Sequence, residues 1–139
     1  MEETARRTPE VSLKDTFLLA AAGLPGGDPR AGVVAEALLY LQQGFDAHYA
    51  QDEATDDDVL VGDNAYALAV ETIARLDEPR FVAVASRMIR DGAGRIAAGG
   101  AVTLEMWTPH LAGLLDIISE EGLESSETRI RAAAGELRG

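Results

Sequence analysis

The sequence contains no cysteine, and it has no long hydrophobic run. Without cysteine, its 139 residues cannot form disulfides or thiolate zinc sites. No uninterrupted apolar run is long enough to span a bilayer, so membrane insertion is not expected. Residues 1–7 are polar and acidic with no hydrophobic segment behind them, which does not resemble a secretory signal. We therefore expect a cytoplasmic protein.

Basic residues are scarce. The chain has 12 Lys and Arg against 24 Asp and Glu, which gives a formal net charge of -12. Phosphate backbones and anionic membrane surfaces repel such a chain, so a nucleic-acid partner is not expected. The acidity either serves solubility or attracts a basic partner or a cation.

The length and the hydrophobic spacing predict one all-α domain, a bundle of five to six helices. Residues 1–11 are polar and are expected to form a disordered tail, with a single helical domain over residues 12–139. Ser12, Thr55, Glu78-Pro79 and Thr108-Pro109 are typical of helix starts. The predicted helices span residues 13–22, 31–51, 55–76, 79–98, 109–121 and 124–138.

Two segments carry a pattern of glycine, acidic and aromatic residues. The first contains Leu41, Gly44, Asp46 and His48, and the second contains Leu60, Gly62, Asp63 and Tyr66. Their order and spacing resemble the front half of the trans-prenyl diphosphate synthases, which have the all-α isoprenoid synthase fold. The likeness is closest to the small, non-catalytic subunit (component 1) of two-component heptaprenyl diphosphate synthases.

This resemblance implies a regulatory subunit. Such a subunit binds a catalytic long-chain trans-prenyl diphosphate synthase subunit and helps to set the length of the product, as for a menaquinone side chain. It forms a hetero-oligomer, with a homodimer possible when it is alone. The resemblance also implies that Mg²⁺ belongs to the catalytic partner and that this chain binds no cofactor.

Catalysis by the chain alone is not expected, because the family's aspartate motif is degraded. After His48, where the family has Asp-Asp-x-x-Asp, only the last position, Glu53, keeps a carboxylate. The chain also has no Lys or Arg between Arg30 and Arg75 to neutralise a diphosphate. One alternative remains, in which Asp52, Glu53 and Asp56 form a displaced magnesium site of a diphosphate-binding enzyme.

Six residues are candidates for a surface that contacts the partner or the prenyl chain. They are Phe45, His48, Tyr49, Asp63, Tyr66 and Met88. His48 is either a metal ligand or a partly buried, hydrogen-bonded histidine. Asp63 lies on an otherwise apolar helix and is either at an interface or in a structural hydrogen bond. A further alternative is a helical protein–protein interaction module unrelated to prenyl synthases.

Overall fold

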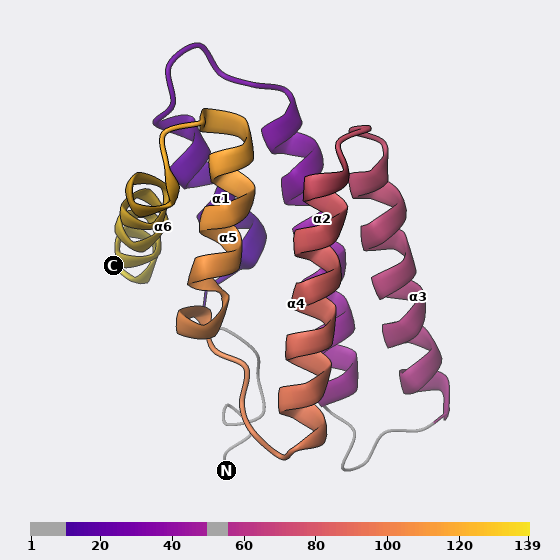
Figure 1. Cartoon of the computed structure of the whole chain (residues 1–139). Helices are drawn as coiled ribbons and strands as arrows, with labels where there is room; N and C mark the ends of the chain where they lie inside the picture. The colour runs from indigo at the N-terminus through magenta and orange to yellow at the C-terminus, as the bar shows by residue number, and fades with distance from the viewer. Residues whose placement is uncertain (1–10, 50–55) are drawn as a thin grey trace.

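A computed structural model describes residues 11–49 and 56–139 of the chain (Figure 1). These residues form six α-helices and no strand, which confirms the predicted all-α bundle. The helices are α1 (Leu13–Ala22), α2 (Arg30–Tyr49), α3 (Asp56–Ala74), α4 (Pro79–Ala97), α5 (Leu104–Ser119) and α6 (Leu123–Arg138). The predicted tail falls mostly on residues 1–10, which lie outside the described residues.

Local capping signals explain where two of these helices begin. The Ser12 hydroxyl accepts a hydrogen bond from the backbone N–H of Asp15 at 3.0 Å, as predicted for the start of α1. At the start of α4, the Glu78 carboxylate accepts from the N–H of Arg80 and Pro79 occupies the first turn. The sequence therefore predicted the first residues of both α1 and α4.

The predicted start of α5 at Thr108-Pro109 is wrong. The helix begins at Leu104, and the hydroxyl of Thr103 accepts from the N–H of Met106 at 3.2 Å. Pro109 lies inside the helix, where it removes one backbone hydrogen bond. Leu104 and Trp107 are buried, so packing of the first turn outweighs that loss.

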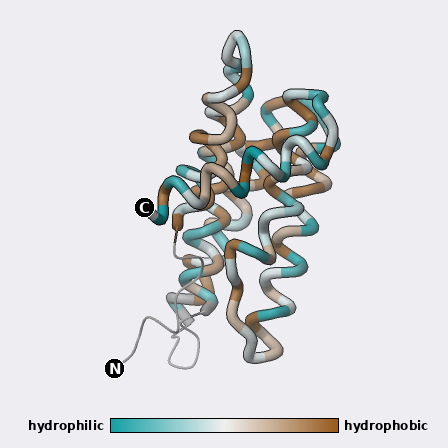
Figure 2. Tube along the Cα trace, turned by 90° about the vertical axis from the view of Figure 1, so that its left-hand side faces the viewer, coloured by the Kyte–Doolittle hydropathy of each residue, from teal (hydrophilic) through white to brown (hydrophobic). Residues whose placement is uncertain are grey.

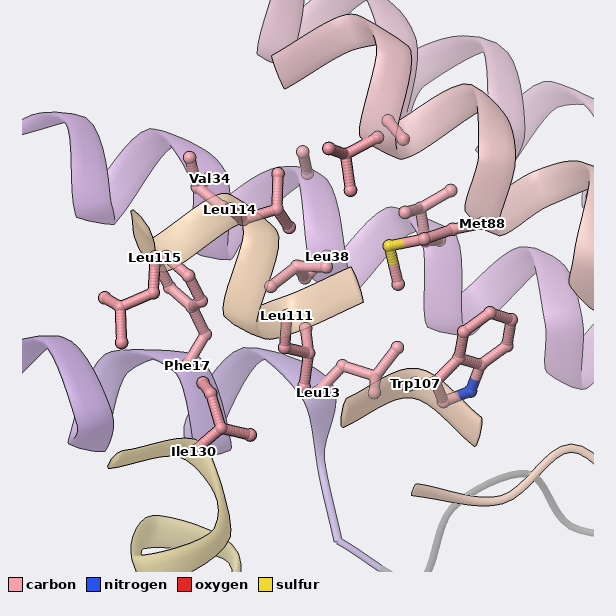
Figure 3. Packing of buried hydrophobic residues seen from close by; sticks show 14 of the residues in the cluster. Leu13, Phe17, Val34, Leu38, Met88, Trp107, Leu111, Leu114, Leu115 and Ile130 are labelled. Carbon is pink, nitrogen blue, oxygen red and sulfur yellow. The ribbon is translucent and has the colours of Figure 1, made fainter. Parts of the chain in front are cut away.

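The six helices enclose one hydrophobic core. Figure 3 shows Phe17 of α1, Leu38 of α2, Trp107 and Leu111 of α5 and Ile130 of α6 converging within it. Each of these five side chains is at most 1% exposed. Hydrophobic and hydrophilic residues are interleaved along the helices in Figure 2, as expected of helices that bury one face.

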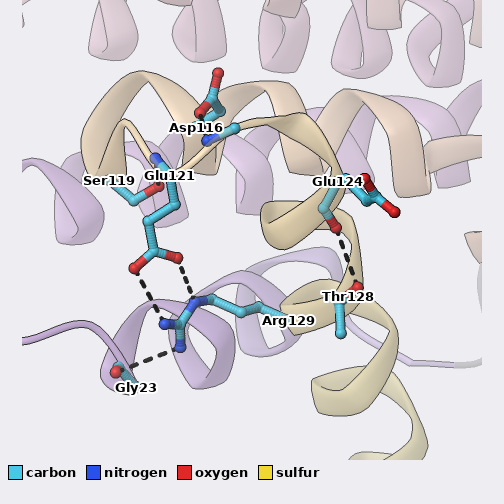
Figure 4. A network of polar contacts seen from close by, with 8 residues as sticks. Gly23, Asp116, Ser119, Glu121, Glu124, Thr128 and Arg129 are labelled. Atoms are coloured by element: carbon cyan, nitrogen blue, oxygen red, sulfur yellow. Dashed lines mark hydrogen bonds and ion pairs between the residues drawn. The ribbon is translucent and has the colours of Figure 1, made fainter.

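Polar contacts of Arg129 join α6 to the loop that precedes it and to the end of α1 (Figure 4). The guanidinium of Arg129 donates to both carboxylate oxygens of Glu121, at 2.9 and 3.2 Å, and to the carbonyl of Gly23 at 3.4 Å. Arg129 therefore links α6 to the loop before it and to the end of α1.

Helix α3 lies at the edge of the bundle, packed against α2 and α4 (Figure 1). Its remaining side faces away from the other helices. Among the described residues, no helix combines the length and the apolar character that crossing a membrane requires.

Candidate functional site

The two predicted segments meet where α2 crosses α3, and their glycines make that crossing close. Gly44 and Gly62 are both buried. A Cβ on Gly44 would lie 3.2 Å from the carbonyl oxygen of Gly62, and a Cβ on Gly62 would lie 3.3 Å from that of Gly44. The two backbones therefore face each other, and a side chain at either position would force the helices apart.

Each glycine is covered by a ring from the opposite helix. The Tyr66 ring of α3 packs over Gly44, and the His48 ring of α2 packs over Gly62. The two rings stack on each other with centroids 5.1 Å apart and planes 2° from parallel. This reciprocal contact explains the glycine and ring positions of both segments by packing.

The exposed end of this contact carries a polar pair. His48 Nε2 donates to Asp63 Oδ1 at 3.1 Å, because an ionised carboxylate can only accept. The His48 side chain is 18% exposed and that of Asp63 is 62% exposed. His48 is thus a partly buried, hydrogen-bonded histidine, and its partner Asp63 makes a structural hydrogen bond from the next helix.

The phenol of Tyr66 lies at the less exposed end of the contact. Its hydroxyl oxygen is buried and has no hydrogen-bond partner within the part of the chain that the structure describes. Burial, helped by the nearby charge of Asp63, raises the pKa of Tyr66 above its ordinary value. The side chain therefore stays neutral at physiological pH and provides mainly apolar contact.

Phe45 connects these rings to the core. Its ring lies 5.4 Å from that of Tyr66 and stacks on Trp107 at 4.8 Å. Both rings press on Gly92 of α4, where an added Cβ would approach Phe45 to 2.5 Å and Trp107 to 2.8 Å. The rings of four residues from three helices thus form one continuous row of contacts, which we call the ring stack: His48 and Tyr66 are stacked, Tyr66 and Phe45 are tilted by 59°, and Phe45 and Trp107 are stacked.

A second histidine–aspartate pair lies at the other end of this stack. The ring of Trp107 is 6.0 Å from that of His110. His110 Nε2 donates to Asp91 Oδ2 at 3.0 Å, which joins α5 to α4. Each histidine of the chain therefore tethers two neighbouring helices at the rim of the core.

The structure brings Phe45, His48, Asp63 and Tyr66 of the predicted interface together at the α2–α3 crossing. It places Met88 inside the core, however, and Phe45 and Met88 are both 0% exposed. A partner could touch these two side chains only by opening the bundle. Phe45 and Met88 are therefore core residues and not part of a partner-binding surface. The side chain of Tyr49 lies outside the described residues.

The alternative magnesium site at Asp52, Glu53 and Asp56 falls mostly outside the described residues. Asp52 and Glu53 lie outside the described residues, and Asp56 is the first residue of α3. Over residues 11–49 and 56–139, no group of three or more His, Asp or Glu side chains is placed to hold a metal ion.

Sequence reasoning missed the outer face of α3. Leu60 and Val61 are 64% and 60% exposed, the two most exposed large apolar side chains among the described residues. The signal was present, because Leu60 and Val61 are large apolar residues of α3 that lie outside the side shared by Gly62 and Tyr66. Such residues are usually covered by a neighbouring element, yet α3 lies at the edge of the bundle.

Comparison with known proteins gave no match to this chain among protein-family models, curated proteins or solved structures. The likeness to prenyl synthase subunits therefore rests on the residues of the two segments.

Proposed function

We propose that this chain is a non-catalytic helical subunit that binds a protein partner through the outer face of α3. The observation that carries the proposal is the exposure of Leu60 and Val61 on an edge helix. Covering a large aliphatic side chain fully contributes about 1.5–3 kcal/mol, so even partial burial of these two would favour association. Exposed apolar residues that adjoin one another on a surface are typical of such contacts.

The ring stack beneath this face gives it a fixed position. The Gly44–Gly62 crossing and the His48–Tyr66 contact hold α3 against α2, and Phe45 anchors both helices to the core. A rigid helix loses little conformational entropy on binding, which favours affinity. The residues of the two segments thus support docking indirectly, by setting where the outer face lies.

The family resemblance supplies the identity of the proposed partner, a catalytic long-chain trans-prenyl diphosphate synthase subunit. In this proposal the partner holds Mg²⁺ and both substrates, and this chain supplies no ligand. Phe45 and Trp107 fill the interior of this bundle. An effect on product length would therefore come from the docked outer surface and not from a channel between these helices.

Reconstitution tests the proposal. The chain and the candidate catalytic subunit are assayed apart and together with an allylic diphosphate, isopentenyl diphosphate and magnesium. We expect a co-eluting complex, with long-chain product formed by the mixture alone. Product formed by the isolated chain would overturn the proposal and favour the site at Asp52, Glu53 and Asp56. A complex without any change in activity would leave a helical interaction module unrelated to prenyl synthases.

A further inference from the structure

The outer face of α3 has a defined composition. Leu60, Val61, Ala67 and Leu68, with Asn64 at their centre, form what we call the α3 stripe. Four of these five residues are exposed, and Leu68 is half-buried. Their spacing of three and four residues places them on one side of the helix.

The described charged residues of α3 beside the α3 stripe are all acidic. Exposed Asp57 and Glu71 lie at its two ends, and exposed Asp63 lies at its side. The sequence has no Lys or Arg from residue 31 to residue 74, and Arg75 follows the end of the helix. A partner helix that lies along the stripe therefore meets apolar side chains with carboxylates of α3 at both ends and at one side.

A second copy of the chain fits this face poorly. If two stripes packed antiparallel about Asn64, Leu60 of one copy would face Leu68 of the other. In the same register, Asp57 of one copy would face Glu71 of the other, at both ends of the contact. Opposed carboxylates at an interface disfavour association, and the net charge of -12 on each chain adds to the repulsion.

The geometry of the stripe suits another helix. Residues spaced by three and four form the ridges that pack into the grooves of a neighbouring helix. The matching partner surface has an apolar stripe of the same spacing, flanked by Lys or Arg that can pair with Asp57, Asp63 and Glu71.

We infer that the α3 stripe binds a basic amphipathic helix of the partner protein. This inference rests on the proposed function only in that α3 is the docking helix, and it adds the chemistry of the partner's surface. Basic flanks would speed association and set its orientation, and the apolar stripe would supply most of the affinity.

Two synthetic helical peptides test the inference on the intact chain. They share one leucine stripe and differ in their flanks, which are lysine in one and glutamate in the other. Fluorescence anisotropy measures their binding to the wild type, to L60A/V61A and to D57N/E71Q. The matched controls on α6 are L123A, since Leu123 is 59% exposed, and E124Q/E136Q, both exposed.

We expect the lysine peptide to bind and the glutamate peptide not to bind. L60A/V61A should weaken binding about tenfold, which corresponds to about 1.4 kcal/mol. D57N/E71Q should weaken it at low salt only, because salt screens exposed charges. The α6 variants should bind like the wild type, and equal weakening by them would overturn the inference, as would equal binding of both peptides.

Two further results separate this inference from the proposed function. A synthase that is activated equally by wild type and L60A/V61A would overturn the α3 docking face and leave the subunit role intact. Peptide binding that depends on α3, without any complex with the synthase, would overturn the subunit role and leave the α3 docking face intact. A dimer of the wild-type chain that L60A/V61A dissociates in sedimentation would show a second copy on the stripe and overturn the inference.

Discussion

Two glycines of α4, two residues apart, should respond in opposite ways to the same substitution. Gly94 is exposed, and a Cβ added there would meet nothing within 4 Å. Alanine at Gly94 should therefore raise the free energy of unfolding by about 0.5–1 kcal/mol, the helix-propensity difference. Gly92 gains the same propensity, but its Cβ would lie 2.5 Å from Phe45 Cε1 and 2.8 Å from Trp107 Cη2.

The cost at Gly92 follows from the surroundings of those rings. Phe45 and Trp107 are 0% exposed and stacked at 4.8 Å, so neither can turn away into solvent. Overpacking of this kind typically costs about 1–3 kcal/mol. Because the propensity gain cancels between the variants, G92A should be less stable than G94A by about 1–3 kcal/mol.

Urea denaturation measures this difference. Far-UV circular dichroism reports on the helices, and the fluorescence of Trp107, the only tryptophan, reports on the ring stack itself. Equal slopes of the unfolding free energy against urea would show that the variants unfold from comparable states. Equal stability of G92A and G94A would refute the reasoning, because the rings would then have room to move.

Three further substitutions test the α2–α3 contact and the α6 tether. Y66F should not lower stability at neutral pH, because it removes a buried hydroxyl without a partner among the described residues. The pKa of Tyr66 is raised in the folded state, so its neutral form contributes fully to the free energy of unfolding below about pH 10, the unfolded tyrosine value, and that contribution is lost at higher pH. In urea titrations above pH 10, Y66F should therefore reduce the fall in the free energy of unfolding by up to ~1.4 kcal/mol per pH unit. G62A should lower the free energy of unfolding by about 1–3 kcal/mol, because its Cβ would overlap the His48 ring; unchanged stability in urea would contradict the close crossing. R129Q should lower the thermal midpoint slightly at low salt and not at about 1 M NaCl, because its pairing with Glu121 is partly exposed.

The residues of the α2–α3 contact could be singled out from the sequence, because they come from two short segments with helical spacing, whereas the outer face of α3 could not. Gly44 and His48 lie one turn apart on α2, as Gly62 and Tyr66 do on α3. The sequence did not show that each glycine receives the ring of the opposite helix, since that depends on the crossing. It also could not show that Met88 would be buried, because an apolar stripe does not reveal what covers it.

By itself, the sequence determined the number and type of the helices, most of their boundaries and the negative charge of the chain. These properties follow from local spacing, capping residues and composition, which need no knowledge of distant contacts. Tertiary structure alone decided that α5 begins before Pro109, because burial of Leu104 and Trp107 depends on helices remote in sequence. It also decided that Leu60 and Val61 stay exposed, since an apolar residue does not reveal whether a neighbouring helix covers it, and here α2 and α4 pack against other sides of α3.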